Sequence, residues 1–448
     1  MKIINNSICF FLGIALLAGC TQVNPSVPDN LNDKNIVTTS TKKAEATDLI
    51  ENYLKKIARE NDELKDTPPQ SILGTKKESL PKIKDTKKLT YFTFEALDNN
   101  LYGDLNRVIN TLESTGSNKN SNILAQTDNW KENNTARYFI TDDKDSDNIN
   151  SEFLQLGTDE ENSGDPKVFS DAVHWAFSNY PAKMKWLNMS THGLGFAGIG
   201  YDDNPENNMN IIQFAQAVKS AIKHQKLDIK IFDACLMATV EVASELQDIS
   251  DTLIGSEDST YYWGNGYNKT FSKLEKKPDM TVEQIAKSLV LDVNEKGNSQ
   301  QTLTISATNL TKIDLLEKEI DKLAIALQEA LPKHREDIFR AFKESKPFAQ
   351  ADDIPFRDIN RLVSLLKDNV ENDKILTICD KINQILYQKG VILLSRQSKM
   401  EKDQGRGLSI YVPMGGKVSA VYRQTHFAKN THWDEFLSAF NATIKPAS

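Results

Sequence analysis

The stretch that most constrains the fold is residues 186–240, in which two short apolar runs flank an amphipathic segment. Residues 186–190 and 227–232 are predicted strands. Between them, apolar residues recur three and four positions apart from residue 211 onward, which predicts a helix. A strand–helix–strand unit of this size places its two strands parallel in one sheet through a right-handed crossover. The chain is therefore predicted to be an α/β protein with a mostly parallel sheet flanked by helices.

Two reactive side chains follow these two strands. His192 comes just after the first strand, and Cys235 comes just after the second. Because the carboxyl ends of parallel strands form the ligand-binding edge of such a sheet, we expect the imidazole and the thiol to meet there. The imidazole and the start of a helix expected directly after Cys235 would both favour the nucleophilic thiolate. The backbone N–H groups of Gly193 and Cys235 are the expected donors to an oxyanion.

At these residues the sequence resembles the clostripain-like cysteine peptidases, which are related to caspases, legumain and gingipains. In that family a His-Gly pair follows one strand and an Ala-Cys pair follows the next. Further blocks carry the resemblance along roughly residues 89–440: Asp98-Asn99-Asn100-Leu101, Gly164-Asp165-Pro166, Tyr180-Pro181-Ala182, Ser256-Glu257 and Gly407-Leu408-Ser409-Ile410-Tyr411-Val412-Pro413. The resemblance implies a caspase-like sheet core with a helical C-terminal portion, and a catalytic dyad of His192 and Cys235.

Acidic residues near the cysteine are candidates for substrate binding. Asp233 precedes Cys235 by two residues, so strand alternation would put both side chains on one side of the sheet. In clostripain-like peptidases an acid at this position is associated with a preference for Arg or Lys before the scissile bond, which implies that Asp233 forms the base of that pocket. Capping of the following helix is the alternative role for Asp233. Glu257 and Asp258, just past a strand predicted at 252–255, are second candidates for an acidic wall of the same pocket.

The N-terminus has the pattern of an exported lipoprotein. A charged start is followed by an apolar run at residues 8–17, which is too short to span a membrane as a mature helix. Leu17-Ala18-Gly19-Cys20 resembles a bacterial lipobox, so Cys20 is the expected lipidation site. A lipid there would anchor the protein to a bacterial membrane, at the cell envelope or cell surface, without spanning it. An ordinary secretory signal is the alternative.

Composition divides the remaining chain. Residues 21–88 are polar and are predicted to be a tether, within which the Lys-rich stretch 66–88 is either a solvated linker or a pro-segment. From residue 89 onward, predicted strands and helices alternate. We expect the catalytic core at residues 89–275 and a C-terminal portion at residues 276–448 that completes the fold.

Charge and cysteine content restrict the partners. The 448-residue chain has a net charge of −8 without a sustained basic stripe in its core, which argues against nucleic-acid binding. Its four cysteines are too few for a disulfide scaffold, and Cys379 is predicted to be a core residue of an amphipathic helix.

An acidic loop raises the question of a metal. Asp143, Asp145 and Asp147 alternate as they would at the start of an EF-hand loop. However, the glycine and the final glutamate of such a loop are replaced by Asn148 and Leu154, so a solvated loop is favoured. Because some clostripain relatives use calcium, calcium stays open as a cofactor and no metal ligands are assigned.

Together these features predict a membrane-anchored cysteine endopeptidase that cleaves proteins or peptides after Arg or Lys. Cys235 would attack the carbonyl carbon and His192 would protonate the leaving amine, so the reaction itself requires no cofactor. A catalytically idle, surface-anchored binding protein on the same fold is the alternative. The sequence does not reveal a third residue that would orient His192. Many family members are cleaved after a basic residue in the loop before the cysteine, but residues 193–218 contain no Lys or Arg.

Overall fold

The computed structural model describes residues 71–129, 135–157, 160–223, 225–260, 266–293, 303–348, 355–398 and 405–444. The predicted signal segment, with Cys20, and most of the predicted tether lie outside these ranges. Within them, residues 71–88 belong to the fold, because β1 (Thr75–Lys76) joins the edge of the sheet and Leu80 is buried in the core.

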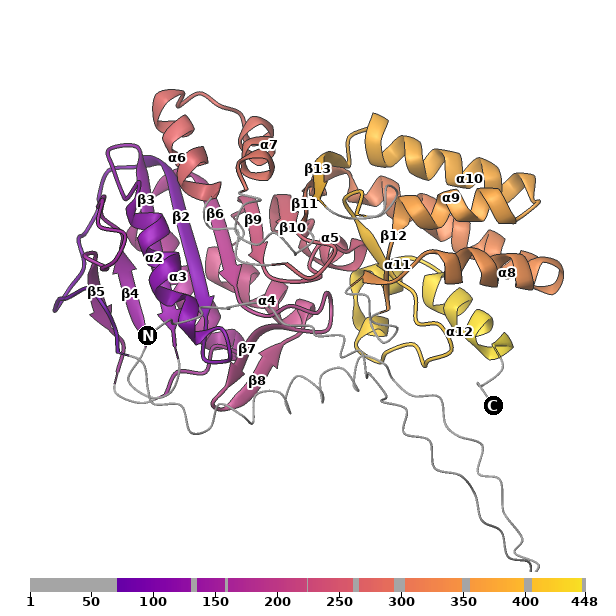
Figure 1. The fold of residues 1–448 in the computed structure, drawn as a ribbon, viewed down its shortest axis with the longest axis horizontal. Helices are drawn as coiled ribbons and strands as arrows, with labels where there is room; N and C mark the ends of the chain where they lie inside the picture. Colours follow the sequence, from indigo (N-terminus) through magenta and orange to yellow (C-terminus); the bar gives the residue numbers. More distant parts are fainter. Residues whose placement is uncertain are drawn as a thin grey trace, which may run out of the picture.

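A ten-stranded sheet organises the described part of the chain, in the order β1-β5-β4-β3-β2-β6-β9-β10-β11-β13 (Figure 1). Its central strands are parallel: β3 (Ser121–Asp128), β2 (Lys87–Ala96), β6 (Ala182–Ser190), β9 (Leu227–Asp233) and β10 (Ser250–Gly255). Antiparallel strands extend it on both sides: β4 (Ala136–Phe139), β5 (Glu152–Gln155), β11 (Leu303–Asn309) and β13 (Ile392–Ser398). A separate hairpin follows the His192 loop: β7 (Ile199–Asp203) and β8 (Glu206–Met209).

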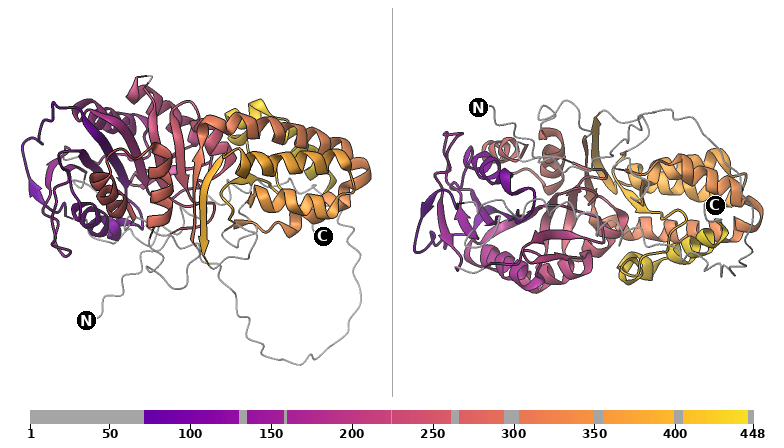
Figure 2. Two further views of the ribbon diagram at one scale, coloured as in Figure 1. Left: turned by 90° about the horizontal axis from the view of Figure 1, so that it is seen from above. Right: turned by 60° about the horizontal axis from the view of Figure 1, so that its bottom comes forward.

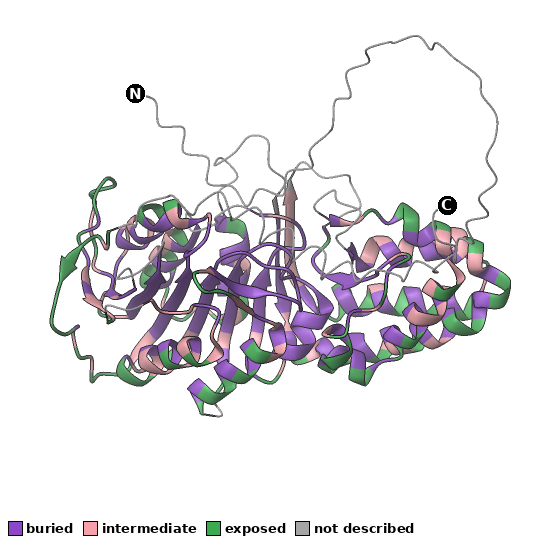
Figure 3. Cartoon of the chain, turned by 90° about the horizontal axis from the view of Figure 1, so that it is seen from below, coloured by how far each residue is buried: buried purple, intermediate pink, exposed green. Residues whose placement is uncertain are grey.

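Alternation along the strands buries both faces of the sheet, which Figure 3 shows as buried ribbon between exposed helix surfaces. Phe94 of β2 packs edge-on against Phe169, at 5.2 Å between ring centroids, on the face covered by α3 (Pro166–Asn179), α4 (Ile211–Ile222) and α5 (Val240–Leu246). Tyr91 of the same strand packs against Phe271, also at 5.2 Å, on the face covered by α2 (Leu105–Glu113), α6 (Tyr267–Lys276) and α7 (Val282–Asp292).

A helical portion lies beside the β11–β13 end of the sheet (Figures 1 and 2). It comprises α8 (Ile313–Glu344), α9 (Ile359–Asn369), α10 (Asp373–Asn383), α11 (His426–Asn430) and α12 (Trp433–Thr443). A small antiparallel pair, β12 (Phe356–Asp358) with β14 (Ser409–Tyr411), connects it to the turn after β9. There the Ser409 N–H donates to the Ala238 carbonyl oxygen at 2.9 Å.

This architecture confirms the predicted α/β class, with a mostly parallel sheet flanked by helices and a helical C-terminal portion. None of the helices in the described ranges combines the length and the apolar character that a membrane crossing requires.

Candidate active site

The predicted histidine and cysteine lie at the carboxyl ends of two neighbouring strands. The parallel ladder between β6 and β9 ends with Ser190 opposite Asp233. His192 and Cys235 each follow two residues after this last pair. A β-carbon added to Gly193 would lie only 2.5 Å from the carbonyl oxygen of Cys235, so the absence of a side chain lets the histidine loop pack on the cysteine turn.

Cys235 lies in a turn, and its side chain is fully buried. Its sulfur accepts a hydrogen bond from the Thr260 N–H at 3.3 Å, and the thiol can donate to the Thr260 carbonyl oxygen at 3.7 Å. The prediction of a helix directly after Cys235 is wrong, because α5 begins at Val240 with Thr239 as its N-cap. Leu236 has a φ of 61°, a left-handed conformation that cannot start a right-handed helix. The N-terminus of α5 is therefore four residues farther along the chain from the thiol than predicted.

His192 is nearly buried, and its Nε2 atom lies 2.6 Å from Oδ1 of Asn100. Because an amide oxygen only accepts hydrogen bonds, Nε2 carries the hydrogen and Nδ1 is the basic nitrogen. Burial lowers the pKa of His192 to about 4, so the ring is neutral near pH 7. The ring of Tyr201 packs edge-on against the imidazole, with 6.2 Å between the ring centroids.

Asn100 was not among the predicted site residues. It lies after β2, whose carboxyl end is at the same sheet edge as that of its neighbour β6. The Asp98–Leu101 block carried part of the family resemblance, which was the available signal. The contact itself depends on β2 being placed next to β6.

Asp233 is the last residue of β9, so the alternative role as a helix cap is wrong. Strand alternation does not extend from Asp233 to Cys235, because the cysteine already lies in the turn. The ladder registers place Asp233 abreast of Ser190 on β6 and of Glu95 on β2. Burial raises the pKa of Glu95 to about 7, which keeps much of this carboxyl protonated near neutral pH.

The two second candidates for the acidic wall differ in position. The Asp258 carbonyl oxygen accepts a hydrogen bond from the Leu236 N–H at 3.2 Å, so this segment lies against the cysteine turn. The Glu257 carboxyl accepts instead from the Gly407 N–H at 2.6 Å. Burial and the charge of Asp358 raise the pKa of Glu257 well above its ordinary value. The Glu257 carboxyl thus contacts the C-terminal portion of the fold, and its role in the pocket stays a prediction.

Comparison with known proteins places this arrangement in a family. The model of the clostripain family matches residues 93–440. The chain belongs to the clostripain family. The clostripain of Hathewaya histolytica is 25% identical to it over 345 residues, which cover 63% of this chain and 63% of that protein. The alignment thus spans less than two thirds of this curated relative.

Solved structures show the same fold. The secreted C11 cysteine protease iotapain from Bacteroides thetaiotaomicron superposes with a TM-score of 0.59 at 16% identity, covering 78% of this clostripain-family chain and 100% of that one. An inactive zymogen C11 protease from Parabacteroides distasonis gives a TM-score of 0.57 at 20% identity, covering 78% and 99% of the two chains.

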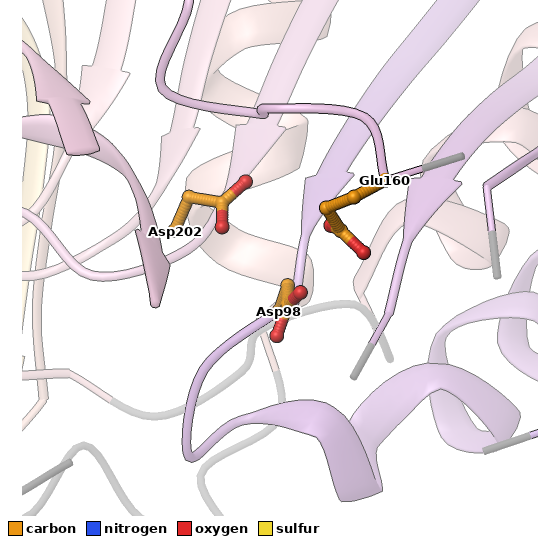
Figure 4. A group of neighbouring side chains, drawn as sticks. All are labelled: Asp98, Glu160 and Asp202. Atoms are coloured by element: carbon orange, nitrogen blue, oxygen red, sulfur yellow. The ribbon is translucent and has the colours of Figure 1, made fainter. Parts of the chain in front are cut away.

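A second acidic group in this clostripain-family protein lies beside the residues that contact His192. Carboxylate oxygens of Asp98, Glu160 and Asp202 lie within 4.8 Å of one another and point toward a common centre (Figure 4). Asp98 and Asp202 are buried, and burial raises the pKa of Asp202 to about 6. Calcium prefers hard oxygen donors, and carboxylates are among its usual ligands. These three carboxylates, which come from three chain segments, therefore fit calcium.

The exposed loop at residues 142–148 has a different character. Asp143 accepts a hydrogen bond from the Asp145 N–H at 3.0 Å, and Asp145 accepts from the Asp147 N–H at 2.9 Å. These carboxylates therefore stabilise their own loop, as expected for a solvated turn.

The two cysteines in the described part of the chain are free thiols. Cys379 is buried in α10, and burial raises its pKa to about 12, which makes it an unreactive core residue. The prediction that Cys379 is a core residue is confirmed.

Proposed function

We propose that this protein is a cysteine endopeptidase in which Cys235 is the nucleophile and His192 is the general acid–base. The observation that carries the proposal is the position of both residues just beyond the paired carboxyl ends of β6 and β9. Membership of the clostripain family supports protein or peptide substrates.

The reaction needs only groups of the chain. The neutral His192 accepts the proton of the Cys235 thiol, and the sulfur attacks the carbonyl carbon of the scissile peptide. Backbone N–H groups of Gly193 and Cys235 would stabilise the oxyanion. The protonated imidazole then gives its proton to the leaving amine as the C–N bond breaks. Water activated by His192 hydrolyses the resulting thioester and restores the thiol.

The proposed specificity is for Arg or Lys before the scissile bond. Asp233 ends β9 two residues before Cys235, the Asp258 backbone bonds to the cysteine turn, and each of these residues is only 5% exposed. A carboxylate shielded from water binds a cationic side chain strongly and discriminates against neutral ones.

We further propose that the enzyme is an exported bacterial lipoprotein. The support is the Leu17–Cys20 sequence after an apolar run, which resembles a lipobox. Acylation of Cys20 would hold the catalytic part at a membrane surface.

Calcium enters the proposal only as a structural ion. Asp98, Glu160 and Asp202 would hold it, and its charge would offset the repulsion between their carboxylates. None of the reaction steps proposed for His192 and Cys235 passes through this site.

The test uses fluorogenic peptides that differ only in the residue before the cut bond, with Arg, Lys, Asp, Asn or Leu there. Residues 21–448 and the matched Cys235→Ala variant are assayed with and without calcium. Cleavage after Arg or Lys that disappears in Cys235→Ala supports the proposal. Cleavage after another residue overturns the proposed specificity. If the wild-type chain cleaves no peptide, with or without calcium and also after removal of residues 21–70, the idle binding protein is favoured.

A further inference from the structure

We propose that Asn100 is a positioning residue that holds His192 in the tautomer required for proton transfer from Cys235. This inference rests on the proposed function of the dyad. It starts from the 2.6 Å separation between Nε2 of His192 and Oδ1 of Asn100, two residues 92 positions apart in the chain.

Hydrogen bonds of the Asn99 side chain fix the backbone before and after Asn100. The neighbouring Asn99 is fully buried, and its side-chain amide donates to the carbonyl oxygens of Ala96 at 3.0 Å and Tyr201 at 2.9 Å. The side-chain oxygen of Asn99 accepts from the Leu101 N–H at 2.9 Å. The backbone on both sides of Asn100 therefore has a defined position.

The same attachment connects the two groups that contact the imidazole. Asn99 bonds to the backbone of Tyr201, and the Tyr201 ring packs edge-on against His192. In addition, the Asp203 N–H donates to the Asp98 carbonyl oxygen at 2.7 Å. The Asn100 loop and the β7 strand thus form one unit around the histidine.

The chemistry of a neutral imidazole explains what this contact achieves. A neutral ring has one donor nitrogen and one acceptor nitrogen. Because the Asn100 oxygen accepts from Nε2–H, the lone pair is held on Nδ1, which must receive the thiol proton. After that transfer the imidazolium keeps the same bond, now strengthened by its charge.

An asparagine suits this position better than an acid. Burial alone brings the pKa of His192 to about 4, so the ring is neutral and only its tautomer and orientation have to be selected. A carboxylate at the position of Asn100 would stabilise the imidazolium and raise the pKa of His192. The amide orients the ring without adding this charge.

The test compares Asn100→Leu, which keeps the size but removes the acceptor, with Asn100→Asp, which keeps an acceptor but adds charge. Asn110→Leu is the matched control at a half-buried position on α2. We expect Asn100→Leu to lower kcat about 10²-fold, with KM changed less than about twofold, because proton transfer is impaired and binding is not. Asn100→Asp is expected to recover most of kcat and to move the acidic limb of the pH profile upward by about 1 to 3 pH units.

Nitrogen-15 NMR of isotope-labelled residues 21–448 supplies a readout that does not depend on turnover. In the Cys235→Ala background, His192 is expected to be the Nε2–H tautomer, and Asn100→Leu is expected to give a mixture of tautomers. An unchanged kcat in Asn100→Leu, or an unchanged pH profile in Asn100→Asp, would overturn the inference. If the wild-type chain cleaves no peptide, the proposed function fails, and the tautomer spectra alone decide the role of Asn100.

Discussion

The backbone N–H of Thr260 donates a hydrogen bond to the sulfur of Cys235 at 3.3 Å. The thiol is fully buried in this arrangement, and the Thr260 carbonyl oxygen also lies 3.7 Å from its sulfur. Thr304 of β11 holds the chain segment that precedes Thr260 in place. Its hydroxyl accepts a hydrogen bond from the Asp258 N–H at 3.1 Å and bonds with the Ser256 hydroxyl at 2.6 Å.

Removing the Thr304 hydroxyl is expected to make the Cys235 thiol more accessible. Thr304→Val should speed alkylation of Cys235 by iodoacetamide at least roughly fivefold, because each of the two hydrogen bonds that it removes stabilises the closed segment by about 1 kcal/mol. Thr308→Val is the matched control on the same strand, since within the described part of the chain the Thr308 hydroxyl has no hydrogen-bond partner. Equal alkylation rates in wild type and Thr304→Val would show that Thr304 does not hold the segment.

The pKa of His192 predicts activity in unusually acidic solution. Because burial places this pKa at about 4, the imidazole stays neutral and able to accept the thiol proton down to that pH. We expect kcat/KM to be retained at pH 5 and to fall as the pH is lowered through about 4. Measuring kcat/KM from pH 3.5 to 8, with recovery of activity on return to pH 7 as the control, tests this. An acidic limb near pH 6.5 would contradict it and indicate a solvated imidazole.

The acidic pocket is tested by removing charges one at a time. Asp233→Asn is expected to lower kcat/KM for an Arg peptide by roughly 10- to 100-fold, because a hydrogen bond to a charged group contributes about 1.5–3 kcal/mol. Glu257→Gln is the matched control, and it should leave the value within about threefold because the Glu257 carboxyl bonds to Gly407, and burial raises its pKa well above the ordinary value. A larger loss in Glu257→Gln than in Asp233→Asn would reverse the two assignments.

Calcium binding is tested through stability. Added CaCl₂ should raise the Tm of the wild-type protein by a few degrees, because an ion that binds only the folded state stabilises it by mass action. Asp202→Asn removes one of the three converging carboxylates and should abolish the shift, whereas Asp145→Asn on the exposed loop should retain it. An equal shift in both variants would place the ion elsewhere, and no shift in the wild type would rule out the site.

Several features were determined by the sequence alone. The alternation and spacing of apolar residues identified β6, α4 and β9 in order, since periodicity reports which side of a local element is buried. Because parallel strands end at one edge, the same pattern placed His192 and Cys235 together at that edge. The core position of Cys379 followed from its helical spacing for the same reason.

Only the tertiary structure decided which groups surround the dyad. The partners of His192 and Cys235, namely Asn100 and Thr260, lie 92 and 25 residues away in the chain. Their contacts depend on β2 and β10 being neighbours of β6 and β9, a strand order that long-range packing sets and local periodicity does not encode. Beyond a strand end, backbone turns direct the side chains: the left-handed Leu236 replaced the predicted helix. The bond between the Glu257 carboxyl and the Gly407 N–H joins residues 150 positions apart, so it too depends on how the C-terminal portion packs on the sheet.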